Sequence, residues 1–152
     1  MKSANDRELT TTLRLGNQPD AFPTESALFE SYFSASTGEE RAIIEEICNG
    51  SSDTSMLVIY KGPSKGSRFL ITREGATIGR SQESEIFLDD VTVSRSHSVI
   101  AYLATSKSFE IADSSSLNGT YVNGTSIDRS VLKNGDEVQI GKFHLLFITG
   151  QK

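Results

Sequence analysis

The chain has 152 residues, a net charge of −5 and one cysteine, Cys48. This length allows one ordinary domain with an appendage, and the negative charge argues against a nucleic-acid partner held by a basic face. A single cysteine excludes an internal disulfide framework and fits a reducing compartment. Because no apolar run nears the roughly 18 residues that span a bilayer, and the N-terminus lacks a signal-peptide core, we expect a cytoplasmic protein without membrane association.

The first 55 residues are acidic and rich in hydroxyl side chains. They contain 10 Asp/Glu against 4 Lys/Arg, together with 8 Ser and 6 Thr, and few aliphatic residues. This composition predicts a mostly disordered tail over residues 1–55. Such a segment either remains solvated or folds back onto the rest of the chain.

One part of this tail carries a helix signal. Thr37-Gly38-Glu39-Glu40 fits a capping box, and Asn49-Gly50 is a stop signal. Between them lie four apolar residues that we place on one helical stripe: Ala42, Ile43, Ile44 and Ile47. We predict a helix over residues 38–48, which at three turns is too short to be stable alone and needs a surface to lie on.

From Met56 onward the sequence becomes β-rich. Short apolar or β-branched runs alternate with turn signals, and Asn-Gly, which supplies positive φ readily, occurs three times. The predicted strands are 56–60, 68–71, 76–78, 98–103, 108–112, 120–122, 126–127, 137–140 and 144–148. This pattern predicts an all-β fold, an antiparallel β-sandwich over residues 56–150.

Three polar clusters lie in the segments between these strands. They are Gly79-Arg80, Ser94-Arg95-Ser96-His97 and Ser116-Leu117-Asn118-Gly119-Thr120. A guanidinium forks onto two phosphate oxygens, a serine hydroxyl donates to a third, and a carboxamide can grip an extended peptide backbone from both its donor and its acceptor. The clusters therefore indicate recognition of a phosphorylated peptide rather than catalysis.

Nothing in the sequence builds a convincing catalytic or metal site. His97 follows Ser94 by three residues without an acid partner at a recognisable spacing, so a histidine that braces the loop is the favoured interpretation. His144 lies in a strand pattern, and two histidines with one cysteine give no zinc cluster. With neither a P-loop nor GxGxxG, we expect no catalytic residue, metal or cofactor.

Together with the spacing Asp113-x-x-Ser116-x-Asn118-Gly119-Thr120, these clusters resemble the forkhead-associated (FHA) domain over about residues 56–150. The resemblance implies an FHA/SMAD-like sandwich of about eleven strands that binds phosphothreonine peptides with loops at one end. It implies that Arg80 and Ser94 contact the phosphate, that Arg95 assists, and that Asn118 holds the peptide backbone. Supporting roles in shaping the loops fall to Gly79, His97, Ser116, Leu117 and Gly119.

Three longer stretches resemble a group of small bacterial regulators, the oxoglutarate dehydrogenase inhibitors and glycogen accumulation regulators. They are residues 86–95, 116–123 and 134–143. The resemblance implies a monomer whose unphosphorylated form binds and regulates the E1 component of 2-oxoglutarate dehydrogenase, glutamate dehydrogenase and glutamate synthase. It also implies that a Ser/Thr kinase phosphorylates a threonine pair in the tail, which then docks in the protein's own phosphate pocket and ends regulation.

The tail sequence departs from that group. The group's motif reads Glu-Thr-Thr-Ser-Val-Phe, whereas this chain has Leu9-Thr10-Thr11-Thr12-Leu13-Arg14. We expect phosphorylation at Thr10 or Thr11, ahead of Thr12. A flexible tether of about 44 residues, from Thr12 to Met56, would have an r.m.s. span of roughly 35–40 Å and would reach any point on the body. The alternative is a generic phosphothreonine adaptor that acts in trans.

Overall fold

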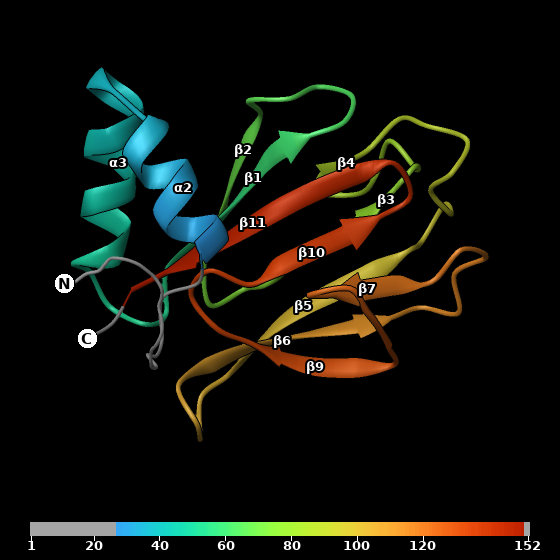
Figure 1. The fold of residues 1–152 in the computed structure, drawn as a ribbon. Coiled ribbons are helices and arrows are strands. Elements are labelled where there is room, and N and C mark those ends of the chain that lie inside the picture. The colour runs from blue at the N-terminus through green and yellow to red at the C-terminus, as the bar shows by residue number, and fades with distance from the viewer. Residues whose placement is uncertain (1–26, 151–152) are drawn as a thin grey trace, which may run out of the picture.

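The computed structural model describes residues 27–150, which form two helices and eleven strands (Figure 1). The tail threonines Thr10, Thr11 and Thr12 lie outside the described residues. One sheet contains β1 (Ser55–Lys61), β2 (Arg68–Ile71), β7 (Thr120–Val122), β8 (Thr125–Ile127), β10 (Glu137–Ile140) and β11 (Phe143–Thr149). The other contains β3 (Ala76–Gly79), β4 (Ile86–Phe87), β5 (Ser98–Leu103), β6 (Ser108–Asp113) and β9 (Arg129–Leu132).

The two sheets confirm the predicted β-sandwich. Their strand orders are β2-β1-β11-β10-β7-β8 and β4-β3-β5-β6-β9. The paired strands run antiparallel except β3 and β4, which are parallel. Strands β4 and β9, both at sheet edges, were not predicted. β4 has only two residues, and the β9 sequence Arg-Ser-Val-Leu does not alternate polar with apolar residues.

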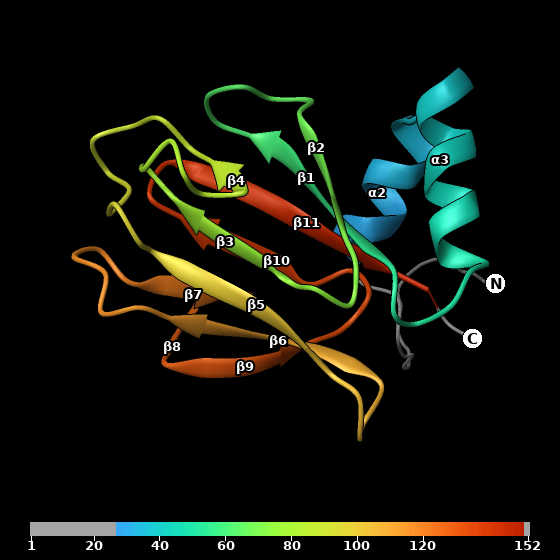
Figure 2. The same cartoon turned by 180° about the vertical axis from the view of Figure 1, so that it is seen from behind.

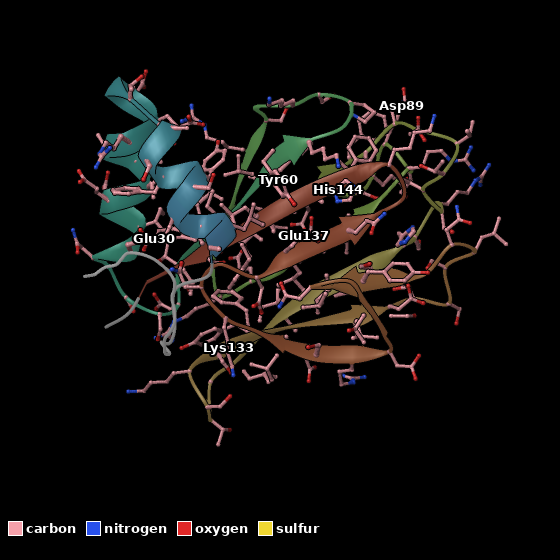
Figure 3. The ribbon with its side chains drawn as sticks, viewed as in Figure 1. Glu30, Tyr60, Asp89, Lys133, Glu137 and His144 are labelled. Atoms are coloured by element: carbon pink, nitrogen blue, oxygen red, sulfur yellow. The ribbon has the colours of Figure 1, made fainter. Side chains whose placement is uncertain are left out.

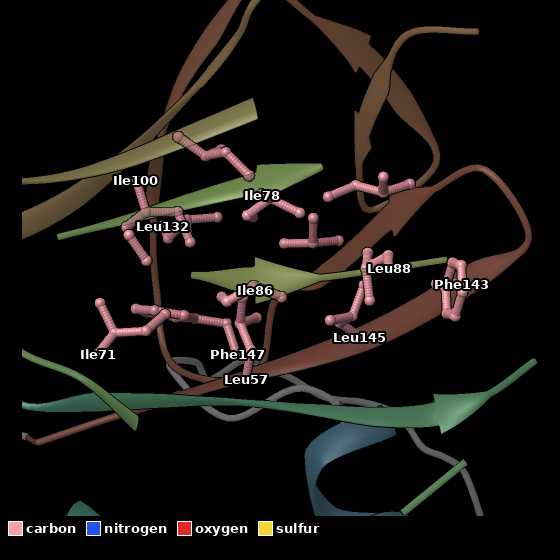
Figure 4. Packing of buried hydrophobic residues seen from close by; sticks show 14 of the residues in the cluster. Leu57, Ile71, Ile78, Ile86, Leu88, Ile100, Leu132, Phe143, Leu145 and Phe147 are labelled. Atoms are coloured by element: carbon pink, nitrogen blue, oxygen red, sulfur yellow. The ribbon is translucent and has the colours of Figure 1, made fainter. Parts of the chain in front are cut away.

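The main core fills the space between the sheets (Figure 4). Leu57 and Phe147 enter it from the six-stranded sheet, and Ile78 and Ile100 enter it from the five-stranded sheet. Each of these side chains is at most 1% exposed. Period-2 alternation along each strand puts these residues on one face, so the interior forms from residues far apart in sequence.

A second cluster lies on the outer face of the six-stranded sheet. In β1 and β11 the residues that alternate with the core positions are also apolar, and they are buried there: Met56, Val58, Leu146 and Ile148. A strand that is apolar at successive positions is buried on both faces. The outer face therefore needs a cover, which the two helices provide.

Helices α2 (Ala27–Ala35) and α3 (Gly38–Cys48) form this cover. Figures 1 and 2 show both helices against β1 and β11, at the end of the sheet away from the β10–β11 turn. Phe29, Ile44 and Ile47 are buried there. Burying a large aliphatic or aromatic side chain is worth about 1.5–3 kcal/mol, so the three together stabilise the docked helices by several kcal/mol.

The helices differ from the sequence expectations in three respects. Residues 27–35, which were included in the tail, are helical. Thr37 is the extended N-cap of α3 but makes no side-chain capping bond, and Glu40 accepts the Tyr32 hydroxyl at 2.5 Å, so the predicted capping box does not form. Ala42 is exposed, whereas Ile44 and Ile47 are buried, so the stripe that faces the sheet is narrower than predicted.

Candidate functional site

The three polar clusters lie at the end of the sandwich away from the helices, in loops that are hydrogen-bonded to one another (Figure 1). The Arg80 N–H donates to the Ser94 carbonyl at 3.0 Å, and the Ser81 N–H donates to the Arg95 carbonyl at 3.2 Å. Gly79 permits this approach, because a Cβ there would lie 2.0 Å from the Arg95 carbonyl oxygen. The β3–β4 and β4–β5 loops are thus held together by their backbones.

His97 joins the β4–β5 loop to the β6–β7 loop. The buried ring accepts the Ser94 N–H at Nδ1 (3.0 Å), so the ring proton is on Nε2, which donates to the Gly119 carbonyl at 2.8 Å. Both ring nitrogens are committed to loop backbone, and neither is available as a base. The geometry agrees with the predicted bracing role.

Asp113 organises the β6–β7 loop. Its carboxylate accepts the Ser116 N–H (3.1 Å), the Ser116 hydroxyl (2.5 Å) and the Thr120 hydroxyl (2.7 Å). The Ser116 oxygen in turn accepts the Gly119 N–H at 2.9 Å. Burial alone would raise the pKa of Asp113, but these hydrogen bonds hold it below its ordinary value. Asp113 was not among the predicted site residues, although its spacing to Ser116 was a usable signal.

The Ser94 hydroxyl is poised to donate. Its oxygen accepts the Leu117 N–H at 2.9 Å, which leaves the hydroxyl proton for an incoming acceptor. The Leu117 side chain is 88% exposed, so its part in this contact is made by its backbone.

Arg80 and Arg95 line an open cleft of about 580 Å³ with Ser81, Gln82, Glu83 and Asp89. Within residues 27–150 neither arginine forms an ion pair. Two guanidinium groups in one cleft suit a doubly charged oxyanion. The carboxylates of Glu83 and Asp89 line the same cleft and offset part of the positive charge of the two arginines.

Asn118 also contacts a neighbouring loop. Its Nδ2 donates to the Thr92 carbonyl at 2.8 Å, which uses one of its two N–H groups, and its carboxamide oxygen accepts no hydrogen bond within the described residues. The side chain is exposed and lines a cavity of about 320 Å³ with Thr92, Tyr121, Gln139, Gly141 and Lys142. The carboxamide oxygen and one N–H are therefore open toward a peptide backbone.

Apart from the three loop clusters, a group of polar side chains lies on the outer face of the six-stranded sheet: Tyr60, Glu137 and His144 (Figure 3). Glu137 accepts the Tyr60 hydroxyl and contacts His144 Nδ1 at 3.0 Å, both through Oε2. Burial, followed by this hydrogen bond, raises the pKa of Tyr60. Tyr60 lines a cavity with Leu28, Ser31 and Tyr32 of α2, and none of the three side chains lines the arginine cleft, so they belong to a different part of the surface.

Residues 27–150 contain neither a cluster of metal ligands nor a membrane-spanning helix. No group of three His, Cys, Asp or Glu side chains there could hold a metal ion. Neither helix in this range is long and apolar enough to cross a membrane.

Comparison with known proteins gives the family. The family model for the FHA domain matches residues 76–141. The glycogen accumulation regulator GarA of Mycolicibacterium smegmatis is 48% identical over 120 residues, covering 78% of this chain and 73% of that protein. The oxoglutarate dehydrogenase inhibitor of Corynebacterium glutamicum is 46% identical over 116 residues, covering 76% of this chain and 74% of that protein.

The fold has solved counterparts as well. An FHA domain from a structural and functional analysis of phosphothreonine-dependent FHA domain interactions superposes with a TM-score of 0.59 at 25% identity, covering 65% of this chain and 99% of that one. The sandwich, the order of the loop clusters and the extent of the identity agree. The chain belongs to the family of FHA-domain regulators that includes the glycogen accumulation regulator and the oxoglutarate dehydrogenase inhibitor.

Proposed function

We propose that this protein is a non-enzymatic cytoplasmic regulator that binds phosphothreonine peptides through Arg80, Ser94, Arg95 and Asn118. The observation that carries the proposal is the loop end of the sandwich, where two arginines without ion pairs in residues 27–150 line one cleft. The Arg80 N–H also bonds the backbone of Ser94, whose hydroxyl proton is free. A phosphate adds about −1.5 to −2 charge near neutral pH. Arg80 accounts for about two charge-assisted bonds of roughly 1.5–3 kcal/mol each.

Calorimetry with peptides tests this proposal. The probe is a synthetic peptide of residues 6–18 phosphorylated at Thr11, with the unphosphorylated peptide as control. We expect binding of the phosphorylated form only, and a loss of at least about 100-fold in Arg80→Ala with an unchanged melting temperature. Equal affinity for both peptides would contradict the phosphate-binding role.

The name oxoglutarate dehydrogenase inhibitor, which several relatives carry, supports an enzyme that acts on 2-oxoglutarate as the regulated partner. We propose that the unphosphorylated protein binds the E1 component of 2-oxoglutarate dehydrogenase, glutamate dehydrogenase and glutamate synthase, and that a Ser/Thr kinase ends this binding by modifying Thr10 or Thr11. The test compares inhibition of 2-oxoglutarate dehydrogenase by the monomeric protein before and after kinase treatment. Inhibition that survives full phosphorylation of the tail would refute the switch.

The docked helices shorten the tether on which intramolecular docking depends. Because α2 occupies Ala27–Ala35, at most about 15 residues separate Thr12 from the folded body, not the 44 expected from the sequence. A flexible chain of 15 residues has an r.m.s. span of roughly 20–23 Å and a maximum near 50 Å. The helices pack near the Ile148 end of β11, and this seven-residue strand, about 20–23 Å long, leads to the loop end. The tail can therefore reach the pocket.

A phosphothreonine adaptor that acts in trans is the second candidate. It is favoured by Arg14, which stands where the group's tail motif has phenylalanine. Mass spectrometry of the kinase-treated chain separates the two candidates: phosphate on Thr10 or Thr11 supports the internal switch, and its absence supports the adaptor.

A further inference from the structure

A short polar unit, Asp90 and Thr92, connects three loops at the rim of the site. Asp90 Oδ2 accepts the Thr92 N–H at 2.9 Å and the Thr92 hydroxyl at 2.5 Å. This pair closes the turn that precedes Ser94, because the Val93 N–H also donates to the Asp90 carbonyl at 3.0 Å. Neither Asp90 nor Thr92 was among the residues predicted to form the site.

From this turn Thr92 makes two contacts to other loops. Its hydroxyl oxygen accepts the Lys142 N–H from the β10–β11 turn at 3.1 Å, and its carbonyl accepts Asn118 Nδ2 from the β6–β7 loop at 2.8 Å. The fit is close: a Cβ at Gly141 would lie 2.3 Å from the Thr92 hydroxyl oxygen, and Gly141 has a φ of +57°. One residue thus fixes the β4–β5 loop against both of its neighbours.

The Thr92 hydroxyl has no proton left to donate to a ligand. Its proton goes to Asp90, and its oxygen accepts from Lys142. The hydrogen bonds from the Thr92 side chain and backbone also hold the pKa of Asp90 below its ordinary value, so the carboxylate stays charged near neutral pH. Thr92 therefore acts on the site through other residues.

The contact to Asn118 orients its carboxamide. Because a carbonyl accepts and cannot donate, the atom of Asn118 facing Thr92 has to be the amide nitrogen. The carboxamide oxygen is left on the exposed side, and it accepts no hydrogen bond from residues 27–150. An acceptor held in this way pairs with a backbone N–H of an extended peptide.

We propose that Asp90 and Thr92 are positioning residues that hold the Asn118 carboxamide oxygen toward the backbone of the bound peptide. This inference rests on the proposed phosphopeptide-binding function. In this scheme Arg80, Ser94 and Arg95 bind the phosphate. The Asp90–Thr92 pair holds Asn118, which binds the backbone of the peptide. Binding of the phosphate group alone should be insensitive to the pair.

The test measures the two ligands separately in full-length protein. Thr92→Val removes the hydroxyl and retains the β-branched shape and the backbone carbonyl, and Asp90→Asn weakens the acceptor. Thr92→Ser retains the hydroxyl, and Thr105→Val is the matched control at an exposed position between β5 and β6. The probes are the Thr11-phosphorylated peptide of residues 6–18, titrated by calorimetry, and inorganic phosphate, titrated by NMR.

We expect Thr92→Val and Asp90→Asn to weaken peptide binding about three- to tenfold, the loss of one ordinary hydrogen bond. Phosphate binding should stay within about twofold, and Thr92→Ser and Thr105→Val should match the wild type. The side-chain N–H signals of Asn118 in the ligand-free protein should shift in Thr92→Val and not in Thr105→Val.

Two outcomes would overturn the inference without touching the proposed function: peptide affinity unchanged in Thr92→Val, or peptide and phosphate affinity reduced equally, as for a general loss of loop structure. Failure of the wild type to bind the phosphopeptide would refute the proposed function, and the positioning role with it. The Asn118 signals would then still show whether the pair orients the carboxamide.

Discussion

At the scale of single residues, the loops of the site are held by buried polar atoms that all have hydrogen-bond partners. His97 is 0% exposed, and its two nitrogens satisfy the Ser94 N–H and the Gly119 carbonyl. We predict that His97→Ala lowers the free energy of unfolding by about 2–4 kcal/mol, because it leaves both backbone groups without a partner and opens a cavity. Urea unfolding measures this loss. His144, which is partly buried and bonds Glu137 instead of the loop backbones, supplies a control, and His144→Ala should cost less.

Asp113 gives a pH-dependent prediction. Its pKa in the folded protein lies below the ordinary 3.8, so its stabilising contribution is present above that value and is lost as the pH falls through the folded pKa. Asp113→Asn should therefore lower stability by about 1–3 kcal/mol at pH 7, and the difference should shrink as the pH falls below 3.8 and through the lower folded pKa. Urea midpoints across this range provide the measurement, and a gap that stays constant with pH would contradict the assignment.

At the scale of elements, the helices are the part of the fold most open to independent change. Ile44 is fully buried between α3 and the sheet, whereas Ala42 on the same helix is exposed. We predict that Ile44→Asp undocks α2 and α3, because an unpaired charge at a 0% exposed position costs far more than the helices gain by docking. Hydrogen exchange should then rise over residues 27–48 while β5 and β6 stay protected.

Ala42→Asp is the matched control, and it should leave the exchange pattern unchanged. The undocked variant should also self-associate, because Met56, Val58, Leu146 and Ile148 become exposed as one apolar patch. Size-exclusion chromatography at several concentrations detects this. A variant with released helices that stays monomeric would show that the patch does not drive association.

Sequence patterns predicted the long strands, since alternation and turn residues are local signals. They missed β4, which owes its existence to pairing with β3 rather than to its own two residues. They also missed α2, because its serines are typical of a linker. This helix is stabilised by packing of Phe29 against the sheet, which no local pattern shows. The order and spacing of the three polar clusters suggested the candidate site residues. The bond from Asn118 to Thr92 joins residues 26 apart, so no local pattern could predict it.

At the scale of the whole molecule, the helices set the length of the tether. Intramolecular concentration falls roughly as the −3/2 power of tether length. For protein phosphorylated at Thr10 or Thr11, we predict that inserting 30 Gly/Ser residues just before Ala27 weakens internal docking about fivefold. The readout is the concentration of competing phosphopeptide that displaces the tail. The same 30 residues added before Met1 should change nothing.

Undocking the helices should have a comparable effect without any insertion. In Ile44→Asp the free chain between Thr12 and β1 grows from about 15 to about 44 residues, a similar fivefold dilution. Competition that is identical in wild type and Ile44→Asp would mean that docking of the helices has no influence on the switch.

The position of the helices has a steric consequence for the proposed switch. Among the described residues the folded body begins at α2, whose neighbour α3 packs near the Ile148 end of β11, whereas the arginine cleft lies past the β10–β11 turn at the opposite end. A tail that docks in this cleft would lie along the length of the sandwich. An enzyme bound anywhere beneath the tail would be displaced, so the proposed docking would block a region that extends well past the few residues touching the phosphate.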